Sequence, residues 1–318
     1  MSECGLVDEC RCGRPAVYHG SGGRLTCGDH LSEWLRSQVF AELKKFIKSS
    51  DSLAVAASGG KDSTALLEMV HDWNCERNNP LPLKAILIDE GITGYREFTR
   101  KFLEKFCEFH DIPLTVVTFR ESLGSNLDSI MKRRKDSQVS SCTICGAFRR
   151  YLLNRVAREA GATKLLLAHN LDDEVQTLLM NLFTGNVGQA GRKGELSETP
   201  DDLFVPRFKP LIRVPEKALT IHGLLHYPSL PDRECPYLRE SLRYEMRLMA
   251  NEYETLHPGF KLKLINTYLR DILPALQKTP PKSGGNLQKC ECCGEPASQL
   301  ICKTCQLRQT LGLKAPDA

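Results

Sequence analysis

The sequence predicts an α/β fold, with a doubly wound parallel sheet that is covered by helices on both faces. Two patterns lead to this prediction. Short apolar runs of strand length alternate with longer runs of helical periodicity from residue 31 to residue 182, which is typical of parallel β–α units. In addition, polar clusters directly follow three of the four expected strands, where the ligands of such sheets bind.

The individual elements follow from the spacing of the apolar residues. We expect strands at Leu53–Ala57, Leu83–Asp89, Leu114–Phe119 and Lys164–His169. We expect helices at Leu31–Ser49, Ser63–Cys75, Tyr95–His110, Ala147–Ala160 and Asp172–Leu182. Residues 185–203 are expected to form an exposed loop, and residues 211–276 to be mostly helical with a turn region at Pro228–Pro236.

Composition bounds the class of protein. The 318 residues are 41% hydrophobic and 26% charged, as in ordinary soluble proteins, and a net charge of +4 does not by itself indicate nucleic-acid binding. With no apolar run of transmembrane length and no signal peptide, we expect a cytoplasmic protein without membrane association. The expected parts are a zinc finger at 1–30, a catalytic domain at 31–278, a linker at 279–288 and a second zinc finger at 289–318.

The most informative segment is the run Ser58-Gly59-Gly60-Lys61-Asp62-Ser63, which joins an expected strand to an expected helix. Two glycines let backbone N–H groups approach an anion, and the start of a helix directs its positive end to the same point. A Walker A loop is excluded, because it requires a glycine five residues before Gly60. The run is therefore a candidate phosphate site of another class, with a plain Gly-Gly turn as the structural alternative.

Fourteen cysteines in a chain of this class indicate metal sites rather than disulfides. The clearest group is C-terminal, where two Cys-x2-Cys pairs provide four thiolates for a structural zinc ion: Cys290, Cys293, Cys302 and Cys305. The N-terminal group is less regular, and its expected ligands are Cys10, Cys12, Cys27 and His30. There Cys4 is an alternative to Cys10, and His19 is a weaker competitor.

The central cysteines differ in kind. Cys142 and Cys145 have no second pair nearby, and their expected partner is Cys235, which is separated from Cys145 by 89 residues. Three cysteines from distant segments suit an iron–sulfur cluster with one iron left open, although a redox disulfide or a persulfide on the pair is an alternative. Basic residues at 132–135 and 149–150 bracket the pair, which suits either a phosphate-rich substrate or a solvated face.

Together the motifs resemble those of the tRNA 2-thiouridine synthetase family, whose members are PP-loop ATP pyrophosphatases. The matching segments occur in order as Ser58-Gly59-Gly60-Lys61-Asp62-Ser63, Asp89-Glu90-Gly91-Ile92-x-Gly94-Tyr95-Arg96, Cys142-x2-Cys145-Gly146 followed by Arg149-Arg150, and His169-Asn170-Leu171-Asp172-Asp173-Glu174. The first segment alone is shared by many ATP pyrophosphatases, whereas the whole set is specific and spans nearly the entire chain.

The resemblance implies an adenine nucleotide alpha-hydrolase-like domain flanked by two zinc fingers, and an ATP-dependent tRNA-uridine 2-sulfurtransferase. ATP would adenylate O2 of a uridine and release diphosphate, and sulfur would then displace AMP from C2. The implied ATP-binding residues are Ala57, Ser58, Gly59, Gly60, Lys61, Asp62, Ser63, Ile88, Arg149 and Ala168, and the implied catalytic residues are Asp62, Arg149 and Asp173. Arg149 is expected to stabilise charge, because an arginine cannot serve as a base.

The resemblance also implies the cofactors and partners. Mg²⁺ is expected near Asp62, and a [4Fe-4S] cluster on Cys142, Cys145 and Cys235. The expected partners are tRNA, a ubiquitin-like thiocarboxylate sulfur carrier or free sulfide, and a second copy of the chain. Two other functions stay open on the sequence alone: another tRNA-modifying adenylation of the amidation or lysidine type, and RNA binding by a catalytically silent zinc-finger protein.

Overall fold

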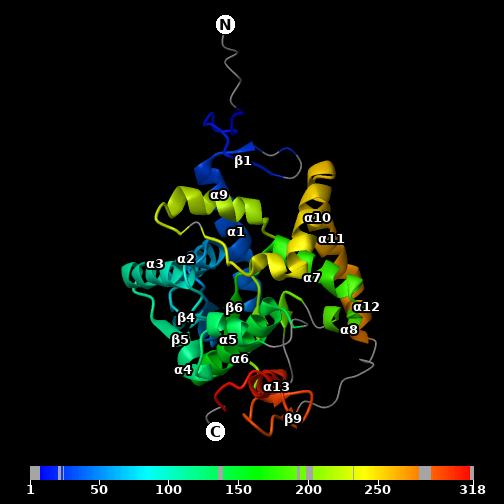
Figure 1. The fold of residues 1–318 in the computed structure, drawn as a ribbon. Coiled ribbons are helices and arrows are strands. Elements are labelled where there is room, and N and C mark those ends of the chain that lie inside the picture. The colour runs from blue at the N-terminus through cyan, green and yellow to red at the C-terminus, as the bar shows by residue number, and fades with distance from the viewer. Residues whose placement is uncertain are drawn as a thin grey trace.

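The computed structural model describes residues 8–20, 23, 25–134, 139–191, 194–197, 203–231, 233–278 and 288–315. Its centre is a six-stranded sheet of order β5-β4-β3-β6-β8-β7 (Figure 1). The strands are β3 (Leu53–Ala56), β4 (Leu83–Asp89), β5 (Leu114–Thr118), β6 (Lys164–Leu167), β7 (Leu196–Ser197) and β8 (Arg207–Phe208). Five are parallel, which confirms the expected fold class, and β7 pairs with β8 in the antiparallel direction.

The topology of the sheet locates the ligand site. From β3 the chain proceeds outward to β4 and β5, then returns to place β6 on the other side of β3. The order of strands therefore reverses between β3 and β6. Open parallel sheets bind ligands at such a switch point, outside the carboxyl ends of the strands. The loops after β3 and β6 carry two of the polar motifs found in the sequence.

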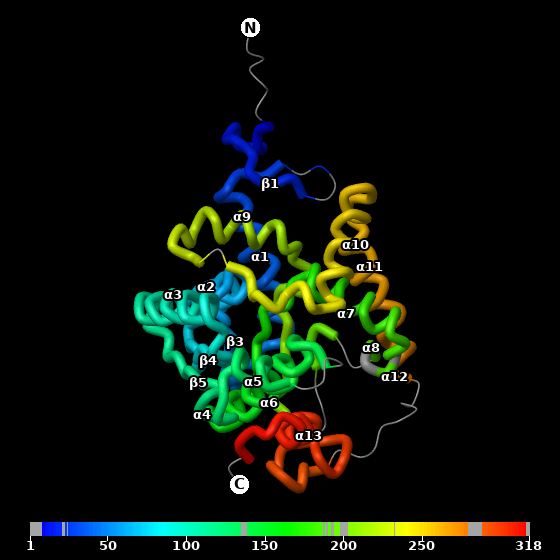
Figure 2. Tube along the Cα trace, in the orientation of Figure 1, coloured from blue at the N-terminus to red at the C-terminus, as the bar shows by residue number. Residues whose placement is uncertain are grey.

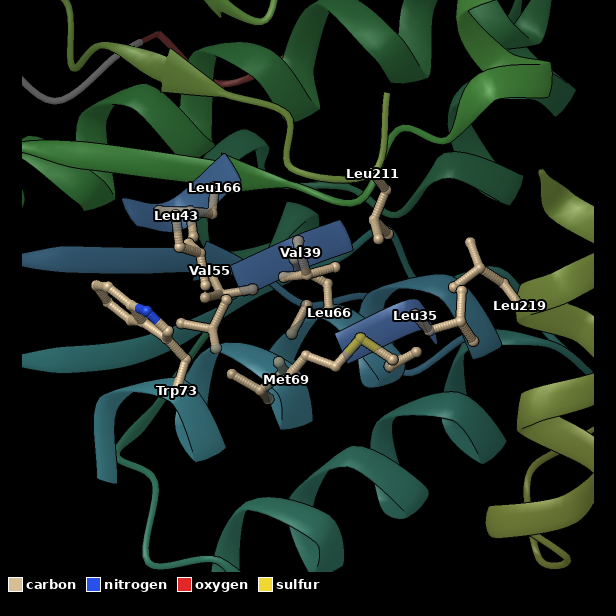
Figure 3. Packing of buried hydrophobic residues seen from close by; sticks show 14 of the residues in the cluster. Leu35, Val39, Leu43, Val55, Leu66, Met69, Trp73, Leu166, Leu211 and Leu219 are labelled. Carbon is tan, nitrogen blue, oxygen red and sulfur yellow. The ribbon is translucent and has the colours of Figure 1, made fainter. Parts of the chain in front are cut away.

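One face of the sheet is covered by α1 (Gly28–Phe46), α2 (Lys61–Cys75), α3 (Arg96–Phe109) and α9 (Glu216–His226). Side chains such as Leu35, Leu66 and Leu219 form one buried cluster with the sheet residues Val55 and Leu166 (Figure 3). All five are fully or almost fully buried, and each large aliphatic side chain removed from water contributes roughly 2 kcal/mol.

The opposite face is covered by α6 (Ser141–Glu159), with α4 (Phe119–Leu123) and α5 (Leu127–Arg133) at its edge. A helical lobe packs beside the sheet and consists of α7 (Leu171–Phe183), α8 (Val187–Ala190), α10 (Leu242–Leu256), α11 (Phe260–Thr267), a π-helical turn (Tyr268–Ile272) and α12 (Leu273–Lys278). Among the described residues, none of the helices has both the length and the apolar character needed to cross a bilayer.

Small cysteine-rich modules lie at opposite ends of the molecule (Figure 2). The N-terminal module contains β1 (Tyr18–His19) and β2 (Leu25–Thr26), and it runs without a break into α1. The C-terminal module contains β9 (Gln288–Lys289), β10 (Pro296–Ala297) and α13 (Lys303–Thr310), and it rests on α6. Cys4 and residues 279–287 of the expected linker lie outside the described residues.

Two expectations about elements were wrong. Helix α6 begins at Ser141 rather than at Ala147, because the Ser140 hydroxyl accepts a hydrogen bond from the Thr143 N–H at 3.2 Å and caps the helix there. The cysteine pair 142 and 145 therefore lies in the first turn of a helix. The expected loop at 185–203 contains α8 and β7, which were too short to leave a periodic pattern in the sequence.

Candidate functional site: a phosphate loop facing three cysteines

The Ser58–Ser63 loop is built around a glycine that no other residue can replace. Gly59 has φ = +75°, and a Cβ atom at this position would lie 2.1 Å from the carbonyl oxygen of Thr99. Gly59 therefore faces α3, whereas Ser58, Gly60, Lys61, Asp62 and Ser63 line a cleft. The role of Gly59 is to shape the turn so that its neighbours reach the ligand.

The serine hydroxyls hold the loop in shape. The Ser63 hydroxyl accepts a hydrogen bond from the Ser58 N–H at 3.0 Å and donates to the carbonyl oxygen of Gly60 at 3.1 Å. Helix α2 starts at Lys61, and its N-cap Gly60 offers no side chain to the first N–H groups. These N–H groups and the positive end of the helix are therefore available to an anion.

Lys61 and Asp62 of the loop form ion pairs that partly neutralise one another. The Lys61 ammonium lies 3.2 Å from Asp62 Oδ2 and 3.0 Å from Glu216 Oε1. Burial raises the pKa of Asp62 to about 6, the attraction of Lys61 opposing this shift. Asp62 Oδ1 is buried and has no hydrogen-bond partner among the described residues. An unsatisfied carboxylate oxygen beside a phosphate site is a suitable ligand for Mg²⁺.

The two aspartates of the His169–Glu174 segment have different surroundings. Asp173 forms a capping box with Asn170 at the start of α7 and lines the cleft, where burial raises its pKa and Arg243 opposes the shift. Asp172 instead pairs with the buried Lys261 and accepts the Glu216 N–H at 2.7 Å. Asp173 is thus positioned for ligands, and Asp172 ties α7 to α9 and α11.

Glu90 anchors the base of the cleft. Its carboxylate is 1% exposed and accepts a hydrogen bond from Arg96 Nε at 2.6 Å. Arg96 also donates to the carbonyl oxygen of Ser58 at 2.6 Å, which links this motif to the phosphate loop. On its other side, Glu90 lies 3.4 Å from the Arg149 guanidinium. Arg149 is therefore held loosely and remains half exposed to the cleft.

The three central cysteines come together in the wall of the same cleft. Cys142 is exposed, Cys145 is buried, and Cys235 lies between these extremes near the start of a 3-10 turn (Leu238–Glu240). Burial raises the pKa of Cys145 to about 12, so its thiolate requires a cation close by. The three sulfur atoms are not all within 4.8 Å of one another. This soft and widely spaced donor set fits a cluster of several iron atoms better than a single metal ion.

The terminal groups are compact by contrast. Cys10, Cys12, Cys27 and His30 place their ligand atoms within 4.8 Å of one another, and so do the four C-terminal cysteines Cys290, Cys293, Cys302 and Cys305. The Sγ–Sγ distance is 3.7 Å between Cys12 and Cys27 and 3.7 Å between Cys293 and Cys302. A tetrahedron with Zn–S bonds of about 2.3 Å has edges of roughly 3.8 Å. Both groups therefore have the dimensions of a zinc site.

Every other expected ATP and catalytic position lies on this one cleft. Ala57, Ile88 and Ala168 line it at the ends of β3, β4 and β6, together with Arg149 and Asp173. The cleft has a volume of about 3080 Å³. Pockets for a single small ligand span roughly 300–1,000 Å³, so there is room for a nucleotide and part of a larger substrate.

Sequence reasoning missed several cleft residues. Glu216, which pairs with Lys61, and Arg243, which faces Asp173, come from the helical region after residue 211. His169 was noted only as part of its motif; half of its side chain faces the cleft, yet the surrounding protein lowers its pKa. Pro215 marks a helix start, but nothing in the sequence indicates that this helix meets the loop 155 residues earlier.

Comparisons with known proteins agree on one relationship. A family model described as a PP-loop domain matches residues 35–220. The tRNA 2-thiolation protein NcsA of Haloferax volcanii is 32% identical, over 95% of this chain and 99% of that protein. The cytoplasmic tRNA 2-thiolation protein 1 of Caenorhabditis elegans is 32% identical, over 96% of this chain and 81% of that protein. The structure of U34-tRNA thiolase NcsA from Methanococcus maripaludis, solved with its [4Fe-4S] cluster, matches with a TM-score of 0.80 and 29% identity over 98% of both chains.

Proposed function

The chain belongs to the family of tRNA 2-thiolation proteins, and on this premise we propose that it adenylates O2 of a tRNA uridine and replaces that oxygen with sulfur. The observation that carries the proposal is that one cleft contains both a phosphate loop and three convergent cysteines. Amidation or lysidine formation needs the loop but has no use for the cysteines. A silent RNA-binding protein would need neither.

The loop performs the first half of the reaction. The N–H groups at the start of α2 and the Lys61 ammonium bind the phosphates and stabilise the charge that develops on the departing diphosphate. Lys61 must exchange its contact with Glu216 for the phosphates when ATP enters. Asp62 would hold Mg²⁺, which supplies charge neutralisation on the phosphates. The product is a uridine whose O2 carries AMP and has become a good leaving group.

The cysteine wall performs the second half. A [4Fe-4S] cluster bound by Cys142, Cys145 and Cys235 would supply an open iron site that carries the sulfur destined for C2. Arg149, half exposed beside Cys145, stabilises the negative charge of the AMP that leaves. Asp173 lines the same cleft and would donate or accept a proton or hold a metal ion there. Two structural zinc ions would close the terminal modules.

The relatives support a finer proposal for the substrate and the partners. The target is uridine 34 of the tRNA, as in the thiolase of M. maripaludis. We assign the protein to the cytoplasm, as in the protein of C. elegans. A ubiquitin-like thiocarboxylate carrier or free sulfide delivers the sulfur, and a homodimer is the working assembly. These last two assignments rest on the family resemblance alone.

The direct test is reconstitution under anaerobic conditions. Protein with its iron restored is incubated with ATP, Mg²⁺, sulfide and a tRNA transcript, and the nucleosides are analysed by mass spectrometry. We expect 2-thiouridine and AMP in equal amounts, and neither product with a transcript that carries cytidine at position 34.

A matched variant separates the two halves of the site. Asp62→Ala should abolish AMP release while the iron content and the absorbance near 400 nm are retained. AMP formation at the parental rate in this variant would contradict the assignment of the loop. Thiolation of an unrelated position in the tRNA would contradict the assignment of the substrate.

A further inference from the structure

Two arginines in the wall of the cleft have no partner. Arg150 on α6 and Arg207 on β8 both line the cleft, and within the described part of the chain neither makes a hydrogen bond, an ion pair or a ring contact. The other cleft arginines differ, since each has a partner. Arg233 donates to the carbonyl oxygen of Gly94 and lies over the ring of Phe98. The remaining ones each lie against a carboxylate: Arg96, Arg149, Arg213, Arg243 and Arg247. Neither reaction step described above uses Arg150 or Arg207.

The charge around this pair is uncompensated. Burial and the charge of Arg150 lower the pKa of Arg207, and burial and the charge of Arg149 lower that of Arg150. Among the described residues, no carboxylate shifts the pKa of either guanidinium; the one opposing group is the Cys145 thiol, whose own pKa of about 12 leaves it uncharged at neutral pH. Guanidiniums placed together without acidic partners repel one another, and this arrangement becomes favourable when an anion binds between them.

A glycine in the second turn of α6 makes room for Arg150. A Cβ atom on Gly146 would lie 3.0 Å from Arg150 Nη1. Glycine in a helix interior costs about 1 kcal/mol relative to alanine, yet Gly146 has an ordinary helical backbone and its φ does not require glycine. The Arg150 guanidinium therefore folds back along the helix, over Gly146 and towards the turn that carries the cysteines.

Two further groups complete the surroundings. Ser197 of the edge strand β7 pairs with Arg207 across the ladder, so their side chains project from the same face of the sheet. Ser197 and the aromatic ring of Phe204 also line the cleft. Phe204 is half-buried, so part of it remains open to the cleft. Guanidinium and hydroxyl donors beside a partly accessible aromatic ring are the combination that holds a phosphate and stacks a base in single-stranded RNA.

We propose that Arg150 and Arg207 form a subsite for a backbone phosphate of the tRNA, next to the nucleotide that is thiolated. The inference rests on the proposed function, because it takes tRNA as the substrate. ATP is the weaker candidate occupant, since β8 is separated from the loop strand β3 by β6, which places the strands about 10 Å apart. The subsite holds the RNA backbone while the target uridine reaches the loop and the cysteines.

The first experiment measures tRNA binding by the full-length protein. Arg207→Gln and Arg150→Gln should each weaken binding of the tRNA transcript roughly tenfold, as expected when a charge-assisted hydrogen bond is lost. The slope of log affinity against log salt should become shallower by about 0.7 for each phosphate contact removed. Arg120→Gln is the matched control, because Arg120 is exposed on α4 and does not line the cleft; its affinity and slope should equal those of the parent.

The second experiment identifies the phosphate. An anticodon stem-loop is prepared with a neutral methylphosphonate at each linkage around uridine 34 in turn. At one linkage, the methylphosphonate should weaken binding of the stem-loop to the parent protein but should not weaken its binding to Arg207→Gln any further. Two changes that remove the same contact are not additive, so this result would identify the phosphate that Arg207 binds.

Kinetics separate this proposal from its alternatives. The KM for tRNA should rise about tenfold in Arg207→Gln while the KM for ATP stays at the parental value. A raised KM for ATP would assign the pair to the nucleotide, and a raised KM for a thiocarboxylate carrier with parental tRNA binding would assign it to the sulfur donor; either result overturns the proposal. If the parent itself neither binds tRNA nor forms 2-thiouridine, the proposed function fails first.

Discussion

The terminal and central cysteine groups arrange the same kind of side chain in opposite ways. At each end of the chain, four ligand atoms lie within 4.8 Å of one another, and most belong to adjacent turns of a short segment. In the centre, three sulfur atoms come from α6 and from a turn about 90 residues later, and they are spread along the wall of an open cleft. A closed set of four ligands leaves no position for a substrate, whereas an open set of three does.

This difference shows how to distinguish a structural metal site from a reactive one. The ligands of the C-terminal site come from one segment of 16 residues, Cys290–Cys305, which has little apolar core of its own. Of the central cysteines, Cys145 belongs to the large core beneath α6, Cys235 packs against that core, and Cys142 is exposed one helical turn before Cys145. Their backbone is therefore positioned by the fold without a metal. Loss of metal should therefore unfold the terminal modules, whereas at the central cysteines it should abolish activity and leave the fold intact.

The largest effect should come from removing one central cysteine. Cys235→Ala should abolish thiolation and the iron signal, because two cysteines cannot retain a cluster that three hold. Zinc should remain at two ions per chain, and the melting temperature should stay near that of the parent, because the terminal groups are intact. Metal analysis together with a melting curve checks both expectations. Retention of full activity would make the central group structural.

The next effect should come from removing a terminal ligand. Cys305→Ser should lose one zinc ion and unfold residues 288–315, because zinc binding supplies on the order of 10 kcal/mol to such modules. Thiolation should fall roughly tenfold rather than vanish, since the module supports α6 from behind through the pairing of Glu295 with Arg158. Hydrogen exchange of the module, measured beside activity, tests this. Cys107→Ser, at a buried cysteine far from either metal group, is the control.

A smaller effect should appear in the pH dependence of stability. The pKa of Asp62 is about 6 in the folded protein and 3.8 in the unfolded chain, so the folded state binds the extra proton and stability is lost as pH rises through 6. Between pH 5 and pH 7 the parent should lose about 1.4 kcal/mol relative to Asp62→Asn. Urea unfolding of both proteins without ATP and Mg²⁺ gives this difference. A constant difference across that range would show that Asp62 is already ionised at pH 5.

The smallest effect should come from Gly146→Ala. The new methyl group displaces the flexible end of Arg150, so tRNA binding should weaken by a few-fold, less than in Arg150→Gln. The helix itself should gain up to about 1 kcal/mol from the better helix former. A variant that is more stable and binds tRNA less well is the expected outcome. Parental tRNA affinity would show that the position of Arg150 is unimportant.

Much of the sheet was predictable from the sequence because its strands are continuous apolar runs. The strands β3, β4, β5 and β6 appear within two residues of their expected limits. The buried side chains of β3, β4 and β6 explain why these three strands leave a clear apolar pattern. The strands β7 and β8 have only two residues each, and their places depend on the edge of a sheet that must already exist. A pattern that short carries no periodicity, so tertiary contacts decided these elements.

The residues of the candidate site likewise fall into those that the sequence predicts and those that it does not. The loop, the strand-end acids and the metal-type cysteines are local motifs, and each could be found by its own spacing. Glu216 and Arg207 carry no motif, because their importance depends on neighbours far away in the chain. Gly146 is an intermediate case. It belongs to the Cys142-x2-Cys145-Gly146 motif, but only the structure shows that it makes room for the side chain of Arg150 on the same helix.

The docking of the C-terminal module on α6 has a consequence for the order of events during synthesis. Residues 288–315 follow the sheet and its helices in the chain, so we expect them to leave the ribosome after α6 has folded onto the sheet. Until then, the side of α6 that receives Glu295 and Arg308 faces solvent. We therefore expect nascent chains to hold the cysteine helix less firmly than finished ones. Iron acquisition would then occur late, after zinc has closed the final module.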